Sequence, residues 1–278
     1  MISTPIRRFG ATILMLLTVI FSGEVLAKTH TDTTSKKAHV IKTTSSSSKI
    51  KVSSKQEYSR NSVKSSSLPD LRKYPSGTPR KKAFLRTVMP YITSQNSAIT
   101  ADRNWLVSKQ YESRWSPSER ARLKDIAARY KVSWNGNTRR VPWNSLLERV
   151  DIIPGSMVAT MAAAESGWGT SKLARNNNNL FGMKCAKGRC NNAPGKVKGY
   201  SQFESVKDSV NAYVVNLNTH PAYSSFRKSR AQLRKADQEV TASTMIHKLK
   251  GYSTQGQSYN NYLFAMYQDN QRLIAAHM

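Results

Sequence analysis

The chain has 278 residues, enough for one or two domains, and a formal net charge of +28 at pH 7. So large a positive charge implies a polyanionic partner or surface, which would be nucleic acid, anionic lipid or an anionic cell-wall polymer. After the first residues no stretch is long and apolar enough to span a membrane, which excludes a membrane protein with several spans.

Residues 1–27 have the pattern of a secretory signal peptide. Arg7 and Arg8 precede an apolar stretch at 11–21, and short residues follow as far as Ala27. This pattern predicts export with cleavage after Ala27. An uncleaved anchor is the alternative, although the apolar run is short for a span. Export places the protein in the periplasm or cell envelope, so we expect a wall partner and no nucleic-acid partner.

Residues 28–80 are rich in Ser, Thr and Lys and contain almost no large apolar side chains. Such a segment cannot bury enough surface to offset the entropy of ordering, so we expect it to be a disordered linker. It would serve as a flexible tether, as a basic arm that lies on an anionic wall or membrane surface, or as both.

Residues 81–142 form the next predicted unit, a helical segment that packs on the core. The apolar spacing between 84 and 111 predicts two amphipathic helices, the first of them interrupted at Pro90. The run Ser116-Pro117-Ser118-Glu119 predicts a helix start with a capping box. Gly136 is expected to turn a short hairpin. This segment carries no chemistry that its residues identify.

A buried helix with one carboxylate at its end is the most informative feature of the chain. The run 154–164 is almost wholly apolar, and Pro154 suits a first helical turn. Glu165 follows on the last turn, and two glycines around Trp168 end the helix. Burial disfavours the charged form, so this carboxyl group should keep its proton to higher pH, as a general acid for glycosidic cleavage must. The alternative is an ordinary solvated or capping glutamate.

The two cysteines lie close together, at Cys185 and Cys190. In an exported chain this spacing predicts a local disulfide, since a metal site would need further ligands and no histidine is near. The stretch 191–203 predicts a β-hairpin, which would hold the only strands of the core. A helix from residue 206, with Tyr213 on its core face, and three later helices are expected to follow.

Two linked motifs identify a family. Ala162-Ala163-Ala164-Glu165-Ser166-Gly167-Trp168-Gly169 and, after it, Asn178-Asn179-Leu180-Phe181-Gly182-Met183-Lys184 resemble the active-site motifs of glucosaminidase-type peptidoglycan hydrolases. The resemblance extends more weakly over residues 143–278, which would be the catalytic domain. It implies a mainly α protein whose lysozyme-like α+β core has one small β-hairpin and is preceded by the helical N-terminal segment.

The resemblance implies roles for several residues. Glu165 would be the general acid, whereas many relatives carry a second acid on the hairpin, and residues 188–203 contain no Asp or Glu. Glu204 and Asp208 are the nearest substitutes, although both are expected to be helix caps. With no second acid, the 2-acetamido group of the substrate itself would attack the anomeric carbon.

Other residues would surround the sugar. Tyr252, in Gly251-Tyr252-Ser253-Thr254, resembles an active-site tyrosine of the family and would steady the acetamido group or the water, unless it is a loop tyrosine packed on the core. Trp168 would stack on a sugar or pack against the helix. The remaining predicted substrate-binding residues, near the turn under the sugar or after Tyr252, are Asn179, Phe181, Gly182 and Tyr259.

These inferences predict an exported hydrolase that cleaves the β-1,4 bond between N-acetylglucosamine and N-acetylmuramic acid in peptidoglycan glycan strands. We expect it to act as a monomer. We also expect no metal and no cofactor, because the chain holds neither a metal-ligand cluster nor a phosphate-binding glycine loop. The alternatives are a lytic transglycosylase, a muramidase, and a peptidoglycan-binding module without catalysis.

Overall fold

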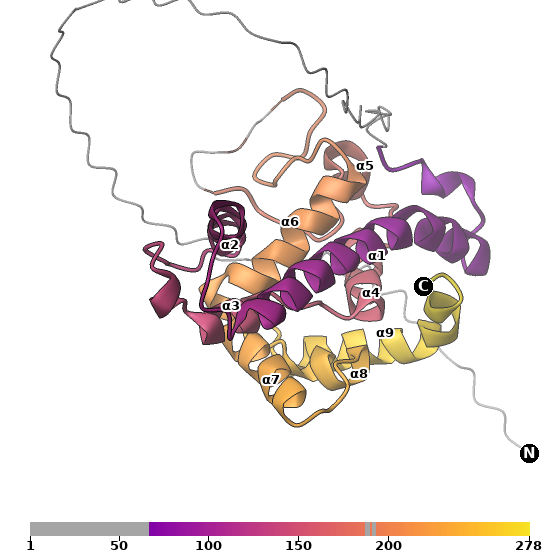
Figure 1. Cartoon of the computed structure of the whole chain (residues 1–278). Helices are drawn as coiled ribbons and strands as arrows, with labels where there is room; N and C mark the ends of the chain where they lie inside the picture. Colours follow the sequence, from indigo (N-terminus) through magenta and orange to yellow (C-terminus); the bar gives the residue numbers. More distant parts are fainter. Residues whose placement is uncertain (1–66, 187–189, 191–192) are drawn as a thin grey trace, which may run out of the picture.

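The computed structural model describes residues 67–186, 190 and 193–278, which are mainly α-helical as predicted (Figure 1). The α-helices of these residues are α1 Thr78–Lys109, α2 Pro117–Arg129, α3 Trp143–Arg149, α4 Gly155–Ser166, α5 Lys172–Asn177, α6 Val206–Thr219, α7 Ser224–Lys235, α8 Ala242–Met245 and α9 Gln257–Ala275. Short 3-10 helices are η1 Leu71–Lys73, η2 Thr138–Arg140, η3 Pro221–Tyr223 and η4 Ile246–Lys248. Within the described residues, no helix combines the length and apolarity that a bilayer crossing requires.

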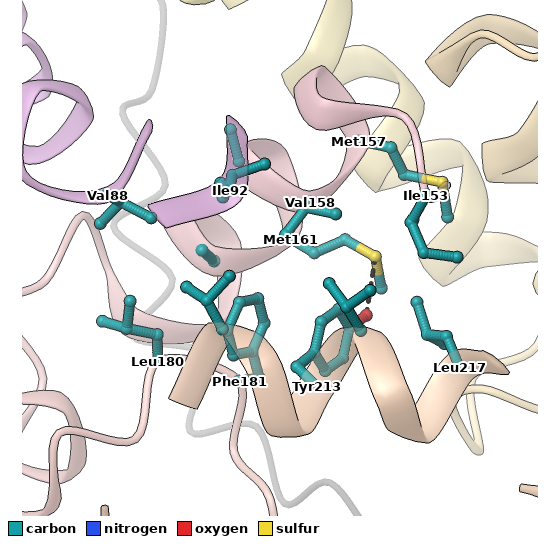
Figure 2. Close-up of a cluster of buried hydrophobic side chains, with 14 of the residues drawn as sticks. Val88, Ile92, Ile153, Met157, Val158, Met161, Leu180, Phe181, Tyr213 and Leu217 are labelled. Atoms are coloured by element: carbon teal, nitrogen blue, oxygen red, sulfur yellow. Dashed lines mark hydrogen bonds between the residues drawn. The ribbon is translucent and has the colours of Figure 1, made fainter. Parts of the chain in front are cut away.

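Helix α4 lies at the centre of the fold, between α1 and α9 (Figure 1). Its residues 157–163 are all buried, which accounts for a helix without a polar face. Figure 2 shows Val158 and Met161 of α4 among side chains from α1 and α6. The helix that ends at Glu165 is therefore held by packing on several sides.

One continuous helix replaces the two that were predicted between 84 and 111. Helix α1 has 32 residues and passes through Pro90, which is exposed. A proline inside a helix costs about 3 kcal/mol because a backbone hydrogen bond is lost. The apolar side chains before and after it, from Phe84 to Leu106, are buried against the core. Their burial on both sides of Pro90 offsets that cost.

The predicted hairpin at 191–203 is wrong for the described residues. They contain only one isolated β-bridge, between Lys184 and Tyr200. The loop's backbone bonds to side chains instead: Asn177 donates to the Val197 carbonyl at 3.1 Å and accepts from the Val197 N–H at 2.8 Å. A side chain that satisfies both backbone groups of a residue removes the need for a partner strand.

Of three further local predictions, two are confirmed and one is wrong. The capping box is confirmed, since Ser116 and Glu119 each accept a hydrogen bond from the other's backbone N–H. The hairpin expected at Gly136 is wrong, because the turn leads into the 3-10 helix η2, which the Asn137 side chain caps. The disulfide between Cys185 and Cys190 is present as predicted.

Order begins earlier in the chain than predicted. Residues 67–80 were assigned to a disordered linker, but they contain η1 and the first turn of α1. Leu68 and Leu71 are buried, and these two side chains supply the buried apolar surface that the rest of the segment lacks. We call residues 68–74 the N-terminal strap. The predicted signal peptide and residues 28–66 lie outside the described residues.

Candidate active site

Glu165 is fixed at the C-terminal end of α4. The helix ends at the next residue, Ser166, because Gly167 adopts a left-handed conformation, with φ 58° and ψ 50°. The turn is closed by backbone bonds, since the Trp168 N–H donates to the Ala163 carbonyl at 2.9 Å. A left-handed C-terminal glycine is favoured because it has no side chain to clash. The partly buried carboxyl group of Glu165 is thus attached to a rigid helix.

The two carboxyl oxygens of Glu165 face different parts of the fold. The hydroxyl group of Tyr259, on α9, donates a hydrogen bond to Oε1. Oε2 lies beside Gly182, where an added Cβ atom would be 3.7 Å away. Gly182 also has φ +64°, a conformation that disfavours other residues. The structure therefore brings together Glu165, Gly182 and Tyr259, three of the predicted site residues.

The surroundings of Glu165 favour its protonated form. Burial raises the pKa of Glu165 from 4.5 to about 7. The hydrogen bond from Tyr259 acts in the opposite direction, because a donor stabilises the ionised carboxylate. Burial prevails, so the carboxyl group is half protonated near neutral pH. A general acid with a pKa close to the working pH is the most effective kind.

This raised pKa gives a testable stability difference. An acid that binds its proton more tightly when folded stabilises the fold below its unfolded pKa, and this stability is lost as pH rises through its folded pKa. For Glu165 the window runs from about pH 4.5 to 7, and a shift of this size corresponds to about 3 kcal/mol. We expect Glu165→Gln to gain stability relative to the wild type over this window. Melting temperatures of both proteins between pH 4 and 8 test this, and parallel curves would contradict it.

Three tyrosines form a cluster around Tyr259, the hydrogen-bond partner of Glu165. The ring of Tyr252 is buried and stacks on Tyr259, with ring centres 5.7 Å apart and planes 16° apart. The hydroxyl group of Tyr213, on α6, lies 2.9 Å from Met161 Sδ and 3.3 Å from the Tyr252 hydroxyl oxygen, and its single proton can serve one of these acceptors at a time. Tyr223 lies 6.1 Å from Tyr252, between ring centres. Burial raises the pKa of Tyr252 and Tyr213 well above the usual value, so these hydroxyl groups stay protonated as donors.

Asn179 and Phe181 support the turn that places Gly182. Asn179 donates to the carbonyls of Met183 at 2.8 Å and Ser201 at 3.0 Å, and it accepts from the Met183 N–H at 3.0 Å. The Phe181 ring stacks on Tyr213, with centres 3.9 Å apart (Figure 2). Both side chains are buried and already satisfied within the protein. Their contacts are those of a scaffold beneath the site.

Trp168 packs against α1. Its ring meets Phe84 edge to face at 5.6 Å between centres, and the Lys81 ammonium lies 5.1 Å from its ring centre. Of the two acids considered as substitutes for a second carboxylate, Asp208 lies in the first turn of α6, where it accepts a 2.7 Å bond from the hydroxyl group of Ser205, the N-cap residue. Glu204 is exposed.

A small pocket lies beside the tyrosines, with a volume of about 10 Å³. Its walls are formed by Phe181, Met183, Lys184, Tyr213, Asn216, Tyr223 and Tyr252. Such a space holds about one water molecule. A larger groove of about 530 Å³ lies along α1 and beside Met278, and none of the predicted site residues lines it.

Comparison with known proteins assigns the chain. The Glucosaminidase family model, described as mannosyl-glycoprotein endo-beta-N-acetylglucosaminidase, matches residues 142–272. The sequence is 84% identical over 278 residues, the whole of both chains, to "Protein bax" of Escherichia coli (strain K12). The chain belongs to the family of Protein bax and carries a glucosaminidase domain. No solved structure matches it.

The glucosaminidase match covers every residue that the sequence predicted for the site. It leaves out α1 and the N-terminal strap, although α1 packs directly on the helix of Glu165.

Sequence reasoning missed two neighbours of the site. Tyr213 was predicted only as a core residue, and its hydroxyl group was the one signal of a further role. Tyr223 follows a Pro-Ala pair in η3 and gave no signal.

Proposed function

We propose that this chain hydrolyses the β-1,4 bond between N-acetylglucosamine and N-acetylmuramic acid in peptidoglycan. The observation that carries the proposal is the setting of Glu165, which is partly buried and lies beside Gly182. Burial raises the pKa of its carboxyl group, and the Tyr259 hydroxyl group donates a hydrogen bond to it. The proposal includes a lysozyme-like arrangement of the core, export to the periplasm or cell envelope, and action as a monomer. A basic N-terminal tail would lie on the anionic wall or membrane.

The chemistry needs one acid and the substrate's own acetamido group. Glu165 donates its proton to the glycosidic oxygen, and the bond from that oxygen to the anomeric carbon breaks. The acetamido oxygen attacks that carbon and forms a cyclic intermediate. Water then opens the ring, and the Glu165 carboxylate accepts the proton that water releases. The reaction consumes one water and restores the protonated acid.

We infer that Tyr252 assists the acetamido group. Its ring stacks on Tyr259, whose hydroxyl group donates to Glu165, so Tyr252 belongs to the same cluster as the proposed acid. A hydrogen bond to the acetamido group would orient it toward the anomeric carbon. Asn179, Phe181 and Gly182 would shape the floor of this subsite, and Trp168 would fix the end of α4.

A lytic transglycosylase is the second candidate. Among the described residues, burial and the Tyr259 hydroxyl set the pKa of Glu165, and no second carboxylate contributes. A single acid suffices when a hydroxyl group of muramic acid itself displaces the leaving sugar, and the product is then an anhydro sugar.

Product analysis distinguishes these reactions. Purified peptidoglycan is digested with the protein, and the fragments are analysed by mass spectrometry with and without borohydride reduction. Reducing N-acetylglucosamine ends would support the proposal. Anhydro-muramic ends would show a transglycosylase, and reducing muramic ends a muramidase. Binding to the wall without any released fragment would show a binding module.

The hydrogen bond from Tyr259 predicts a change in pH dependence. Removing it by Tyr259→Phe takes away a donor that favours ionised Glu165, so the pKa of Glu165 rises further. The acid then stays protonated to higher pH. We expect the alkaline limb of the kcat/KM profile to move to higher pH. Tyr262→Phe is the control, since the Tyr262 ring lies 6.2 Å from that of Tyr259, between ring centres, and is half exposed. An unchanged limb in Tyr259→Phe would rule out this role for the hydroxyl group.

A further inference from the structure

The N-terminal strap lies outside the region matched by the glucosaminidase model, yet it contacts both motifs of the site. Leu71 of the strap is 0% exposed and Leu68 is 7% exposed. Burial this complete is unusual for a segment that directly follows a long hydrophilic stretch. It raises the question of what these two side chains hold in place.

The first contact is at the turn that follows Glu165. A Cβ atom added to Gly169 would lie 2.6 Å from Leu71 Cδ1, 3.2 Å from Phe84 Cδ2 of α1 and 3.3 Å from Leu68 Cδ2, so the two leucines fill the space above this glycine together with Phe84, and Leu71 comes nearest. The Gly169 N–H donates to the Ser166 hydroxyl at 2.8 Å, which ties the contact point back to α4. A shift of the leucines would therefore reach the residue next to Glu165.

The second contact is with the motif that places Gly182. The Leu68 N–H donates to the Asn178 side-chain oxygen at 3.2 Å. The Asn178 amide group in turn donates to the carbonyls of Phe203 at 3.1 Å and Glu204 at 3.2 Å. Asn178 is buried and begins the run that reaches Gly182, beside Glu165.

The strap is held by a bond within it and by a bond to α1 at its C-terminal end. Asp70 accepts from the Arg72 N–H at 3.1 Å and so caps η1. Arg80, in the first turns of α1, donates to the Tyr74 carbonyl at 2.9 Å. The strap thus has a defined conformation and is anchored on α1, which also packs on α4.

We propose that the N-terminal strap is a positioning element of the active site, which joins Gly169 to Asn178 and thereby fixes Glu165 relative to Gly182. Its kinetic consequence rests on the function proposed above. A displacement of about 1 Å at a catalytic group can lower a rate by about 100-fold. Leu71 acts through the two motifs and is a positioning residue.

The test compares two buried leucines. Leu71→Ala removes the contact with Gly169, and Leu123→Ala, on α2, removes an equally buried side chain elsewhere. At a temperature where circular dichroism shows both variants folded, we expect Leu71→Ala to lower kcat by about 10- to 100-fold, with a smaller change in KM. Its alkaline pH limb should move to lower pH, as Glu165 becomes more exposed. Leu123→Ala should keep the wild-type kcat and pH profile, and the volume-conserving Leu71→Met should restore both.

A readout without substrate separates this proposal from the proposed function. Amide hydrogen exchange at Trp168 and Gly169 should be faster in Leu71→Ala and unchanged in Leu123→Ala. Equal kcat losses in the two alanine variants, or unchanged exchange at both amides, would overturn the positioning role. If the wild type releases no glycan fragments, the proposed function fails, and the exchange data alone decide whether the strap holds the motifs.

Discussion

Glu165→Gln is expected to lower the rate of glycan-strand cleavage by about 100- to 10,000-fold, the range that a general acid contributes. Glutamine has the same shape and can still accept the Tyr259 hydrogen bond, so the fold and the position of the side chain should be kept. What is lost is the proton, which an amide cannot donate to the leaving oxygen. The measurement is the initial rate of fragment release from purified peptidoglycan, with wall binding measured in parallel.

Two matched substitutions make this test specific. Glu239→Gln changes an exposed glutamate and should leave the rate unchanged. Glu204→Gln tests the nearest acid after the second motif and should also have little effect if the substrate's acetamido group replaces a second acid. A large loss in Glu204→Gln would contradict the one-acid mechanism. An unchanged rate in Glu165→Gln would reject Glu165 as the acid.

Asp151→Asn is expected to destabilise the fold by about 3–5 kcal/mol, the usual result when one partner of a buried ion pair is removed. Asp151 is buried in the link between α3 and α4, and three arginines surround its carboxylate. Arg234 donates two hydrogen bonds to it, at 3.0 and 3.1 Å. Arg103 and Arg230 approach within 3.6 and 3.7 Å. Without the carboxylate, these cations face one another with no counter-charge.

The fully buried Arg230 makes this loss severe. Burial lowers the pKa of Arg230 to about 10, and the charge of Asp151 is what opposes that shift. We expect the melting temperature of Asp151→Asn to fall by about 10 °C or more. Asp125→Asn, an exposed position on α2, is the control and should change it little. Equal melting temperatures for the two variants would show that the other bonds of the arginines suffice.

Local patterns predicted the helix of Glu165 well. An apolar run followed by glycines predicts a buried helix and its end whatever the rest of the chain does, because propensity and capping act within a few residues. The same holds for the capping box at Ser116 and Glu119. The motif resemblance led to the family that the comparisons show.

Predictions that required knowledge of partners were wrong. The hairpin at 191–203 was predicted from turn residues, but the side chain of Asn177 binds the loop backbone instead. Two helices were predicted between 84 and 111, the first of them interrupted at Pro90, but burial on both sides of the proline keeps α1 continuous. Residues 67–80 were predicted to be disordered from composition, and two leucines were enough to order the strap.

The sequence by itself determined where the candidate acid lies, that it ends a buried helix, and which family its motifs indicate. These are properties of neighbours along the chain. The tertiary structure alone decided which groups meet that acid. Tyr259 comes from α9, Gly182 from a loop and the strap from before α1, and their contacts depend on how distant segments pack. The pKa of Glu165 follows from the same packing, because burial by residues far along the chain is what raises it.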